Sequence, residues 1–576
     1  MDINQFIINE IANRLGSGKT KLSSARIAKI KRKASKKYGK KCPTNIELLE
    51  SYRKMAKCGE IKPDKILENA LITKDTRTIS GVAVIAVLTN PYPCPGACIY
   101  CPNEKNMPKS YLSNEPAVMR AILTGFDPYK QVQARIKSLE ATGHKTDKIE
   151  LIVMGGTFSY LPEKYQTWFI KECFRACDEK PKSQKPKAKT ASGRLQTLAV
   201  LQKQNERSKH RIVGLTLETR PDYINKEEIL RMRELGATRV ELGVQSIYDD
   251  VLKLNGRGHG RSEIIEATRL LKDAGFKINY HMMPNLPGSS FRKDVSMFRE
   301  LFSNPDFHPD LVKIYPCVVV KNAPIYKWWK KGKYRPYSGE KLLDLLSEIK
   351  KNLPYYVRVT RVIRDIPSTS IVAGNKISNL RQVLDTKSAK EGWRCKCIRC
   401  REIRNAYADE NQSPVLELFR EDYPASDGLE IFLSFEDSKR KNLYSMLRLR
   451  INPDVIATRQ SRNSAKKTSR LEIIPTPSFK GVVIPALENA AIIREVHTYG
   501  QLVSISAKNK RSPQHTGLGK KLIAEAERIA QEEFEVKKIA VISGVGVRDY
   551  YRKLGYRLKD GYMIKCFKIK TKEKRR

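Results

Sequence analysis

Three cysteines stand close together in the segment Cys94-Pro-Gly-Ala-Cys98-Ile-Tyr-Cys101, which places three thiols on one loop. Iron–sulfur clusters take thiolate ligands, and three sulfurs on a four-iron cluster leave one iron without a protein ligand. Catalytic metal sites keep such an open position. A zinc knuckle is the alternative, but it would need a fourth Cys or His close by, and the next histidine is His144. The spacing therefore predicts a [4Fe–4S] cluster with an open iron.

A second group of thiols occurs in Cys395-Lys-Cys397-Ile-Arg-Cys400. The chain lacks a secretion-signal pattern at its start, so closely spaced thiols indicate metal ligands rather than disulfides. The spacing suits a structural zinc ion with a fourth ligand from elsewhere, which the sequence does not identify. A reactive-thiol role is the alternative. We expect the zinc to join the two large domains on either side of it.

A third pattern precedes a helix predicted over residues 518–533. Its glycines expose successive backbone N–H groups at the N-terminus of that helix, where a pyrophosphate can bind. An ordinary glycine turn is the alternative. The residues concerned are Gln514, His515, Thr516, Gly517, Leu518, Gly519 and Lys520. About thirty residues later, Tyr550 and Tyr551 are adjacent, and either phenol could serve as a proton donor near a thioester while the other packs in the core.

These residues need a scaffold, and from about residue 81 short apolar runs alternate with helix-sized segments. Six such units predict a parallel, partly closed α/β barrel, with its chemistry at the C-terminal ends of the strands. Cys94 follows the first run, and Gly155-Gly156 ends the second, where the backbone can approach a ligand closely unless the pair is an ordinary turn. Further polar residues expected at strand ends are Glu218, Arg220, Gln245, Lys313 and Tyr315.

The rest of the chain divides around this barrel. We predict a basic helical unit over 1–75, the barrel over 76–390, a zinc-binding linker over 391–412, and an α/β domain over 413–576 whose strands are mostly antiparallel. In the helical unit, Thr44 is expected to cap a helix, with Glu47 three residues later. A segment rich in Lys, Pro and Ser after Cys177 indicates a surface insertion.

The composition points to a polyanionic partner. Lys and Arg number 109 against 62 acidic residues, a formal net charge of +47, and basic residues gather near both ends of the chain. Such a field attracts nucleic acid, although a proteome that simply favours lysine is the alternative. The sequence contains no run of about 18 apolar residues, the length that a membrane-spanning helix needs. We therefore expect a cytoplasmic protein that does not bind a membrane.

Two parts of this chain each resemble a known superfamily. The CxxxCxxC loop resembles that of the radical S-adenosylmethionine superfamily, in which the free iron chelates the methionine part of the cofactor. That resemblance implies that the turn at Gly155 and Gly156 meets the cofactor's amino group, and Lys313 is a further candidate for cofactor binding. The glycine pattern at 514–520 resembles the [RQ]xxGxG/A signature of the GNAT acetyltransferases, in which a tyrosine commonly approaches the coenzyme A sulfur. This implies acetyl-CoA as a second cofactor.

With both modules in this order, the chain resembles the catalytic acetyltransferase subunit of Elongator, in its stand-alone archaeal-type form. The resemblance covers essentially the whole chain and rests on stretches such as RTISGVAVIAVLTNPYPCPGACIYCP, MGGTFSYLP, VGLTLETRPD, RVELGVQSIYDDVLKLNGRGH, CKCIRCRE and ISGVGVRDYYRKLGY. It implies formation of 5-carboxymethyluridine at the tRNA wobble position. In the mechanism proposed for that family, a deoxyadenosyl radical takes hydrogen from the acetyl methyl group, the carbon radical adds to uridine, and the thioester is hydrolysed.

The implied partners are the tRNA anticodon stem-loop and an electron donor for the cluster, while a homodimer or further Elongator subunits remain open. Two other functions compete with this one. A protein lysine acetyltransferase would use the C-terminal domain alone, and a tRNA-binding assembly factor would have no turnover. The complete set of Cys94, Cys98 and Cys101 disfavours the first, because a scaffold has no need of a cluster. The paired tyrosines and the complete glycine loop disfavour the second.

Overall fold

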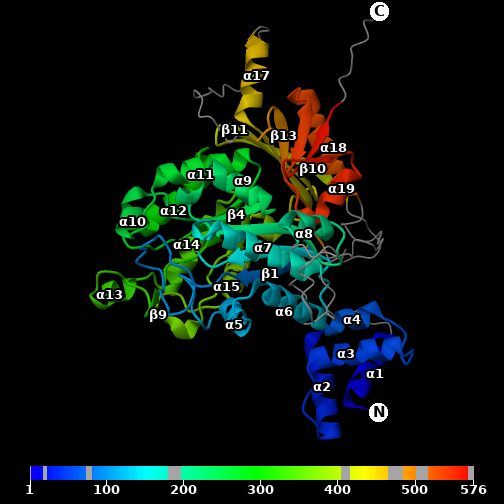
Figure 1. Cartoon of the computed structure of the whole chain (residues 1–576). Coiled ribbons are helices and arrows are strands. Elements are labelled where there is room, and N and C mark those ends of the chain that lie inside the picture. The colour runs from blue at the N-terminus through cyan, green and yellow to red at the C-terminus, as the bar shows by residue number, and fades with distance from the viewer. Residues whose placement is uncertain are drawn as a thin grey trace, which may run out of the picture.

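The computed structural model describes residues 2–16, 23–72, 81–178, 196–403, 415–464, 484–500 and 517–567. Figure 1 shows a helical N-terminal unit below, a central sheet wrapped by helices, and a second sheet above it. Among the described residues, no helix has the length and apolar character needed to cross a membrane.

The N-terminal unit consists of four helices around a small apolar core. They are α1 (Ile3–Gly16), α2 (Ser24–Tyr38), α3 (Asn45–Lys57) and α4 (Lys65–Leu71). Thr44 and Glu47 form the predicted capping box at the start of α3, which satisfies backbone N–H groups that have no partner within the helix. The unit docks on the barrel through Arg53, which donates to the backbone oxygen of Glu140 at 3.1 Å.

The central sheet has seven parallel strands in the order β1-β2-β3-β4-β5-β6-β8, which confirms the partly closed parallel barrel. Its strands are β1 (Ala83–Leu88), β2 (Lys148–Met154), β3 (Arg211–Thr219), β4 (Arg239–Gln245), β5 (Lys277–Met282), β6 (Leu311–Ile314) and β8 (Arg358–Arg361). Six of these correspond to the apolar runs in the sequence. The seventh, β8, is only four residues long and carries two arginines, so its pattern was not recognised.

Helices cover the outer face of this sheet because their apolar residues recur every three or four positions. In α11 these are Ile264, Ala267 and Leu271, all buried. The helices are α5 (Pro116–Leu123), α6 (Pro128–Ala141), α7 (Glu163–Asp178), α8 (Leu198–Asn205), α9 (Lys226–Glu234), α10 (Asp249–Leu254), α11 (Arg261–Asp273), α12 (Phe291–Ser303), α14 (Gly339–Lys351) and α15 (Leu380–Lys390). After β6, a small excursion contains β7 (Val319–Val320), α13 (Ile325–Lys330) and β9 (Ile371–Ala373), and α16 (Ile398–Arg401) follows α15.

The C-terminal sheet has the order β10-β11-β12-β13-β14-β16-β15 and is antiparallel except between β13 and β14. Its strands are β10 (Glu417–Ala425), β11 (Gly428–Glu436), β12 (Leu443–Ile451), β13 (Ala490–Thr498), β14 (Lys538–Val541), β15 (Arg557–Lys559) and β16 (Tyr562–Cys566). The helices of this unit are α17 (Pro453–Ser464), α18 (Leu518–Arg528) and α19 (Arg548–Arg552). A π-helical turn, Ile529–Glu533, extends α18 to the predicted end of that helix.

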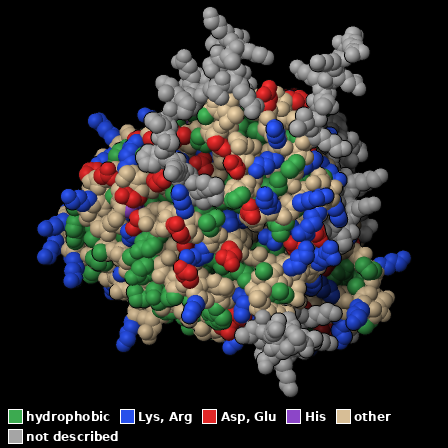
Figure 2. Space-filling model, turned by 45° about the horizontal axis from the view of Figure 1, so that its top comes forward, with side chains coloured by type: hydrophobic (Ala, Val, Ile, Leu, Met, Phe, Trp, Pro, Cys, Tyr) green, Lys and Arg blue, Asp and Glu red, His purple; other side chains and the backbone are tan. Residues whose placement is uncertain are grey.

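The net positive charge does not form one continuous patch on the face that Figure 2 shows. Lys and Arg side chains spread over that face with Asp and Glu among them. A polyanion would therefore bind at local clusters of basic residues rather than to the whole face.

The two sheets meet at a tightly packed interface. A side chain cannot replace hydrogen at Gly544, where an added Cβ would lie 2.1 Å from the backbone oxygen of Val213 on β3. The same holds at Gly546, whose Cβ would lie 2.6 Å from that of Arg211. These glycines let the turn before α19 lie directly on the barrel.

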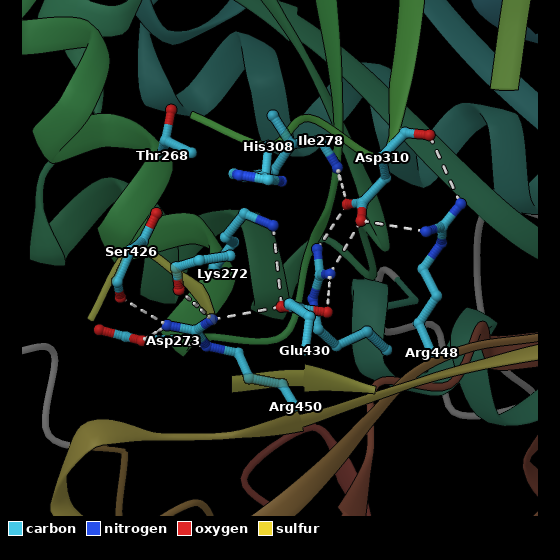
Figure 3. A network of polar contacts seen from close by, with 12 residues as sticks. Thr268, Lys272, Asp273, Ile278, His308, Asp310, Ser426, Glu430, Arg448 and Arg450 are labelled. Carbon is cyan, nitrogen blue, oxygen red and sulfur yellow. Dashed lines mark hydrogen bonds and ion pairs between the residues drawn. The ribbon is translucent and has the colours of Figure 1, made fainter. Parts of the chain in front are cut away.

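Buried ions fill the centre of this interface (Figure 3). Asp310, just before β6, is fully buried and accepts hydrogen bonds from the Ile278 backbone N–H and from Arg494 of β13, both at 2.9 Å. Arg494 also donates to Glu430 of β11 at 2.8 Å, and Arg448 of β12 lies 3.5 Å from Asp310. Burial opposes the charge on Asp310, but Arg494, Lys272 and Arg448 together outweigh burial and lower the pKa of this carboxyl group. The carboxylate of one domain is thus matched by cations of the other.

We expect Arg494→Met to lower the free energy of unfolding by about 3–5 kcal/mol, because it leaves Asp310 buried without its main partner. Lys272→Met is the matched control. Lys272 is also fully buried, but its Nζ lies 3.7 Å from Glu430 and has no hydrogen-bond partner in the described structure. Its removal should cost much less. Urea denaturation followed by circular dichroism measures both, and equal losses would contradict this account of the interface.

Candidate active site

The loop of Cys94, Cys98 and Cys101 follows β1 at the C-terminal edge of the parallel sheet, as predicted. Cys98 and Cys101 are buried, whereas Cys94 is partly exposed. The backbone of Ile99 anchors the loop, because its N–H donates to the Asn255 oxygen at 3.1 Å. The three thiols therefore sit on a fixed segment with one side near solvent.

Two buried arginines lie against this loop. Arg257 donates from Nη1 to the sulfur of Cys98 at 3.4 Å and from Nη2 to the backbone oxygen of Gly243. The Nη1 of Arg220 has no hydrogen-bond partner among the described residues. A Cβ added to Gly96 would lie 2.4 Å from that same Nη1, so the guanidinium contacts the cysteine loop. The sulfur pocket is lined by positive charge.

This charge changes the ionisation of the thiols. Burial alone would raise the pKa of Cys98, but Arg257, with smaller contributions from Tyr100 and Arg220, outweighs burial, and the pKa is lowered. For Cys101, burial is the largest influence and raises the pKa of the thiol to about 11. Of these two buried thiols, the one that contacts Arg257 is therefore more readily converted to a thiolate ligand.

Several buried polar atoms around the loop have no partner within the described structure. They include Nη1 of Arg220, Nε of Arg257 and Oε1 of Gln245. Gln245 also has a positive φ of 71°, an uncommon conformation for a residue other than glycine. Buried polar groups normally have partners, so these atoms together indicate a site that a polar ligand completes. The donor set thus fits a cluster with a polar cofactor beside it.

Gly155 and Gly156 form the turn at the end of β2. Both have positive φ values, 132° and 100°. An added Cβ at Gly155 would lie 2.0 Å from Oγ1 of Thr89, so only glycine fits against the end of β1. At Gly156 the nearest atom to an added Cβ is the Lys109 oxygen at 3.7 Å. The turn therefore exposes backbone without side chains beside the end of β1, the strand that leads into the cysteine loop.

A chain of ionisable groups runs across the barrel interior. Lys313 on β6 pairs with the buried Glu241, whose Oε2 lies 3.0 Å from Nε2 of His281. His281 in turn lies 3.6 Å from Glu218, which accepts a hydrogen bond of 2.9 Å from Tyr111. Burial opposes ionisation of Glu241, but Lys313 and His281 keep its pKa well below the usual value. Lys313 is thus held inside the barrel by a carboxylate.

In the C-terminal domain, the glycine pattern stands at the start of α18. Gly517 is the N-cap in the left-handed conformation, and an added Cβ at Gly519 would lie 3.6 Å from the hydroxyl of Tyr550. Within the first turn of this helix, the side chain of Leu518 is buried and that of Lys520 is exposed. The other three residues of the pattern, Gln514, His515 and Thr516, lie outside the described residues.

The structure separates the two adjacent tyrosines. Tyr550 is 37% exposed, and its hydroxyl lies by Gly519 at the start of α18. Tyr551 is buried in the apolar core of the C-terminal sheet, where burial raises the pKa of its phenol. Tyr550 therefore has access to a ligand at this helix, whereas Tyr551 packs.

The sulfur atoms of Cys395, Cys397 and Cys400 lie within 4.8 Å of one another. Their loop is held by both domains. The Ile398 N–H donates to the Val357 oxygen, just before β8, at 2.8 Å, and the Ile403 N–H donates to the Leu443 oxygen on β12 at 3.0 Å. These three thiols stand where the barrel's last strand meets the C-terminal sheet.

Sequence reasoning assigned no role to Arg257, although it lies in the quoted stretch LNGRGH. An arginine between glycines is usually a surface residue, and only the fold brings it to Cys98, which is 159 positions away. The buried arginines of the interface were missed for the same reason.

The chain is similar to known proteins over nearly all of its length. Residues 92–299 match the Radical SAM superfamily and residues 309–390 the Radical_SAM C-terminal domain. A tRNA uridine(34) acetyltransferase of Methanocaldococcus infernus is 45% identical over 97% of this chain and 98% of its own. Human Elongator complex protein 3 is 38% identical over 94% and 93%.

A solved structure agrees with these similarities. The archaeal Methanocaldococcus infernus Elp3 with an N-terminal deletion (1–46) has a TM-score of 0.68 and 43% identity, covering 85% of this chain and all of that one. Its fold therefore extends across both sheets described above. This chain belongs to the family of the tRNA uridine(34) acetyltransferases and Elongator complex protein 3.

Proposed function

We propose that this protein modifies the wobble uridine of tRNA, forming 5-carboxymethyluridine with acetyl-CoA as the carbon donor. The observation that carries the proposal is the set of unpartnered buried polar atoms around the cysteine loop, in a chain whose whole length matches tRNA uridine(34) acetyltransferases. A lysine acetyltransferase would have no use for such a site.

Cys94, Cys98 and Cys101 would hold a [4Fe–4S] cluster. Such a cluster would supply one-electron reduction of a bound S-adenosylmethionine. The chain's own part is to hold and shield this site. Arg257 and Arg220 compensate the thiolate charge, the bare backbone of Gly155 and Gly156 can accept a cofactor's polar groups, and Gln245 offers an unpaired acceptor. Lys313, held by its ion pair with Glu241, would face the bound cofactor from β6.

The N-terminus of α18 would hold acetyl-CoA, with Gly517 and Gly519 exposing backbone N–H groups to its pyrophosphate. Of the two tyrosines, we assign the role near the thioester to Tyr550, because its hydroxyl lies beside Gly519. Cys395, Cys397 and Cys400 would bind zinc and fasten the barrel to the C-terminal sheet. The basic helix α2 would contact tRNA phosphates.

With cluster reconstituted anaerobically, S-adenosylmethionine, acetyl-CoA, a reductant and unmodified tRNA should yield carboxymethyluridine, read by mass spectrometry of nucleosides. Cys98→Ala should abolish the product, because the cluster loses a ligand. If tRNA stays unmodified while both proteins acetylate a lysine substrate equally, the proposed function is wrong.

Tyr550→Phe should slow turnover about 100-fold, because it removes a positioned proton donor. Tyr551→Phe, the matched change one residue away, should leave most activity because Tyr551 packs in the core. Single-turnover assays of tRNA modification and of acetyl-CoA consumption measure both. The reverse ranking would transfer the role to Tyr551.

Arg257→Gln should shift the midpoint potential of the reconstituted cluster to more negative values by on the order of 100 mV. The reduced cluster carries one more negative charge, and a neighbouring cation and its hydrogen bond to sulfur stabilise that state. Arg261→Gln is the control, since Arg261 pairs with Glu300. A redox titration followed by electron paramagnetic resonance reads the shift independently of turnover, and an unchanged potential would contradict it.

A further inference from the structure

A short excursion from the barrel carries aromatic and basic side chains in an unusual density. Between Lys321 and Gly339 the chain has no acidic residue. We call this segment the aromatic–basic lobe. Its basic residues are Lys321, Lys327, Lys330, Lys331, Lys333 and Arg335, all exposed. Its three central aromatic residues are Tyr326, Trp328 and Trp329, all half-buried.

The aromatic rings stand on a rigid base. Helix α13 projects from the left edge of the molecule in Figure 1. The rings of Tyr326 and Trp329 are stacked, with centroids 5.8 Å apart and planes inclined at 24°. Nζ of Lys330 lies 5.2 Å from the centroid of Tyr326. The rings of Tyr326 and Trp329 are therefore held against each other, beside the ammonium group of Lys330, before any partner binds.

The lobe is joined directly to the cysteine loop. The N–H of Ile325, the first residue of α13, donates to the Ile99 oxygen at 2.8 Å, and the Asn103 N–H donates to the Asn322 oxygen at 2.9 Å. Ile325 is fully buried in the same apolar cluster as Cys98. The far end of the lobe is anchored by Tyr334, whose hydroxyl donates to the Asn285 oxygen at 2.8 Å. Whatever binds the lobe is thereby placed next to the cysteine pocket.

Half-exposed rings interleaved with lysines suit one class of partner. Unpaired nucleotides stack their bases on aromatic faces while lysines contact their phosphates, whereas a double helix keeps its bases inside. A purely structural cap over the cluster would explain the rings but not six exposed cations without an acidic residue. The composition therefore favours single-stranded nucleic acid.

We propose that the aromatic–basic lobe binds the unpaired nucleotides that flank the target uridine in the anticodon loop. This rests on the proposed function. The lobe would stack the bases on either side of the uridine next to the cysteine loop. The uridine is thereby kept out of the base stack of the anticodon loop and placed at the active site. It thus recognises the loop's single-stranded form rather than the tRNA's overall charge.

The test measures binding of a fluorescent anticodon stem-loop RNA to the full-length protein by anisotropy, without S-adenosylmethionine. Trp329→Ala and Trp328→Ala should each weaken binding about tenfold, the effect typical of losing one stacked base. Trp329→Phe, which keeps an aromatic ring at this position, should retain most of the wild-type affinity. Trp168→Ala is the matched control, because Trp168 is 40% exposed and lies on α7, outside the lobe, where its ring is tilted against that of Tyr165 with centroids 5.5 Å apart.

A second arm removes the RNA's half of the contact. A stem-loop with abasic sites beside the wobble uridine should bind the wild type weakly, and Trp329→Ala should weaken that binding no further. Binding of a duplex RNA of equal charge should be the same for wild type and variants. Cluster content and the circular dichroism spectrum verify that each variant is folded.

The proposal is overturned if the tryptophan variants bind the stem-loop as tightly as the wild type. If those same variants are instead reduced more slowly by an acidic electron-transfer protein, the lobe is the docking face of the electron donor. Failure of the proposed function looks different: the wild type would then form no modified uridine, whatever the lobe variants do in the binding assay.

Discussion

The carboxylate of Asp310 lies fully buried between two domains, at a point where an unmatched charge would cost several kcal/mol. The barrel itself supplies it with a backbone N–H from Ile278, and the C-terminal sheet supplies the guanidinium of Arg494. Only the docking that brings β13 onto the start of β6 satisfies both. This requirement, together with the glycines that allow the turn before α19 to lie on β3, sets one relative placement of the two sheets.

That fixed placement matters because the two candidate sites stand on different sheets. The cysteine loop hangs on the C-terminal edge of the parallel sheet, and α18 begins beside β13, the strand that carries Arg494. A reaction that uses groups from both sites needs them in constant register, because misplacement by about 1 Å can cost two orders of magnitude in rate. The thiols at 395–400 tie the same two sheets together a second time, through β8 and β12.

Positive charge serves two purposes in this protein. Inside, Arg257 and Arg220 lie within a sulfur pocket and favour its negatively charged forms. Outside, lysines are spread over the surface and concentrate in α2 and in the aromatic–basic lobe, on different parts of the molecule in Figure 1. Buried cations act strongly on one partner, whereas exposed ones are screened and act collectively on a polyanion.

Local pattern alone determined much of the architecture. The strand at Arg239–Gln245 and the capping box at Thr44 follow from neighbours a few positions apart. The cysteine motif was likewise expected on the loop after the first strand, because Cys94 directly follows that apolar run in the sequence. The choice between Tyr550 and Tyr551 could not be made this way, because consecutive residues of a helix point in different directions and the packing decides which faces the core.

Contacts between distant segments were also beyond local pattern. Arg257 meets Cys98 across 159 positions and Arg494 meets Asp310 across 184. Nothing in the spacing of either pair marks it, because a buried ion pair depends on where two domains meet. The sequence by itself determined most of the elements, apart from short ones such as β8, and the chemistry they carry. The tertiary structure decided which charges compensate one another, since that depends on burial.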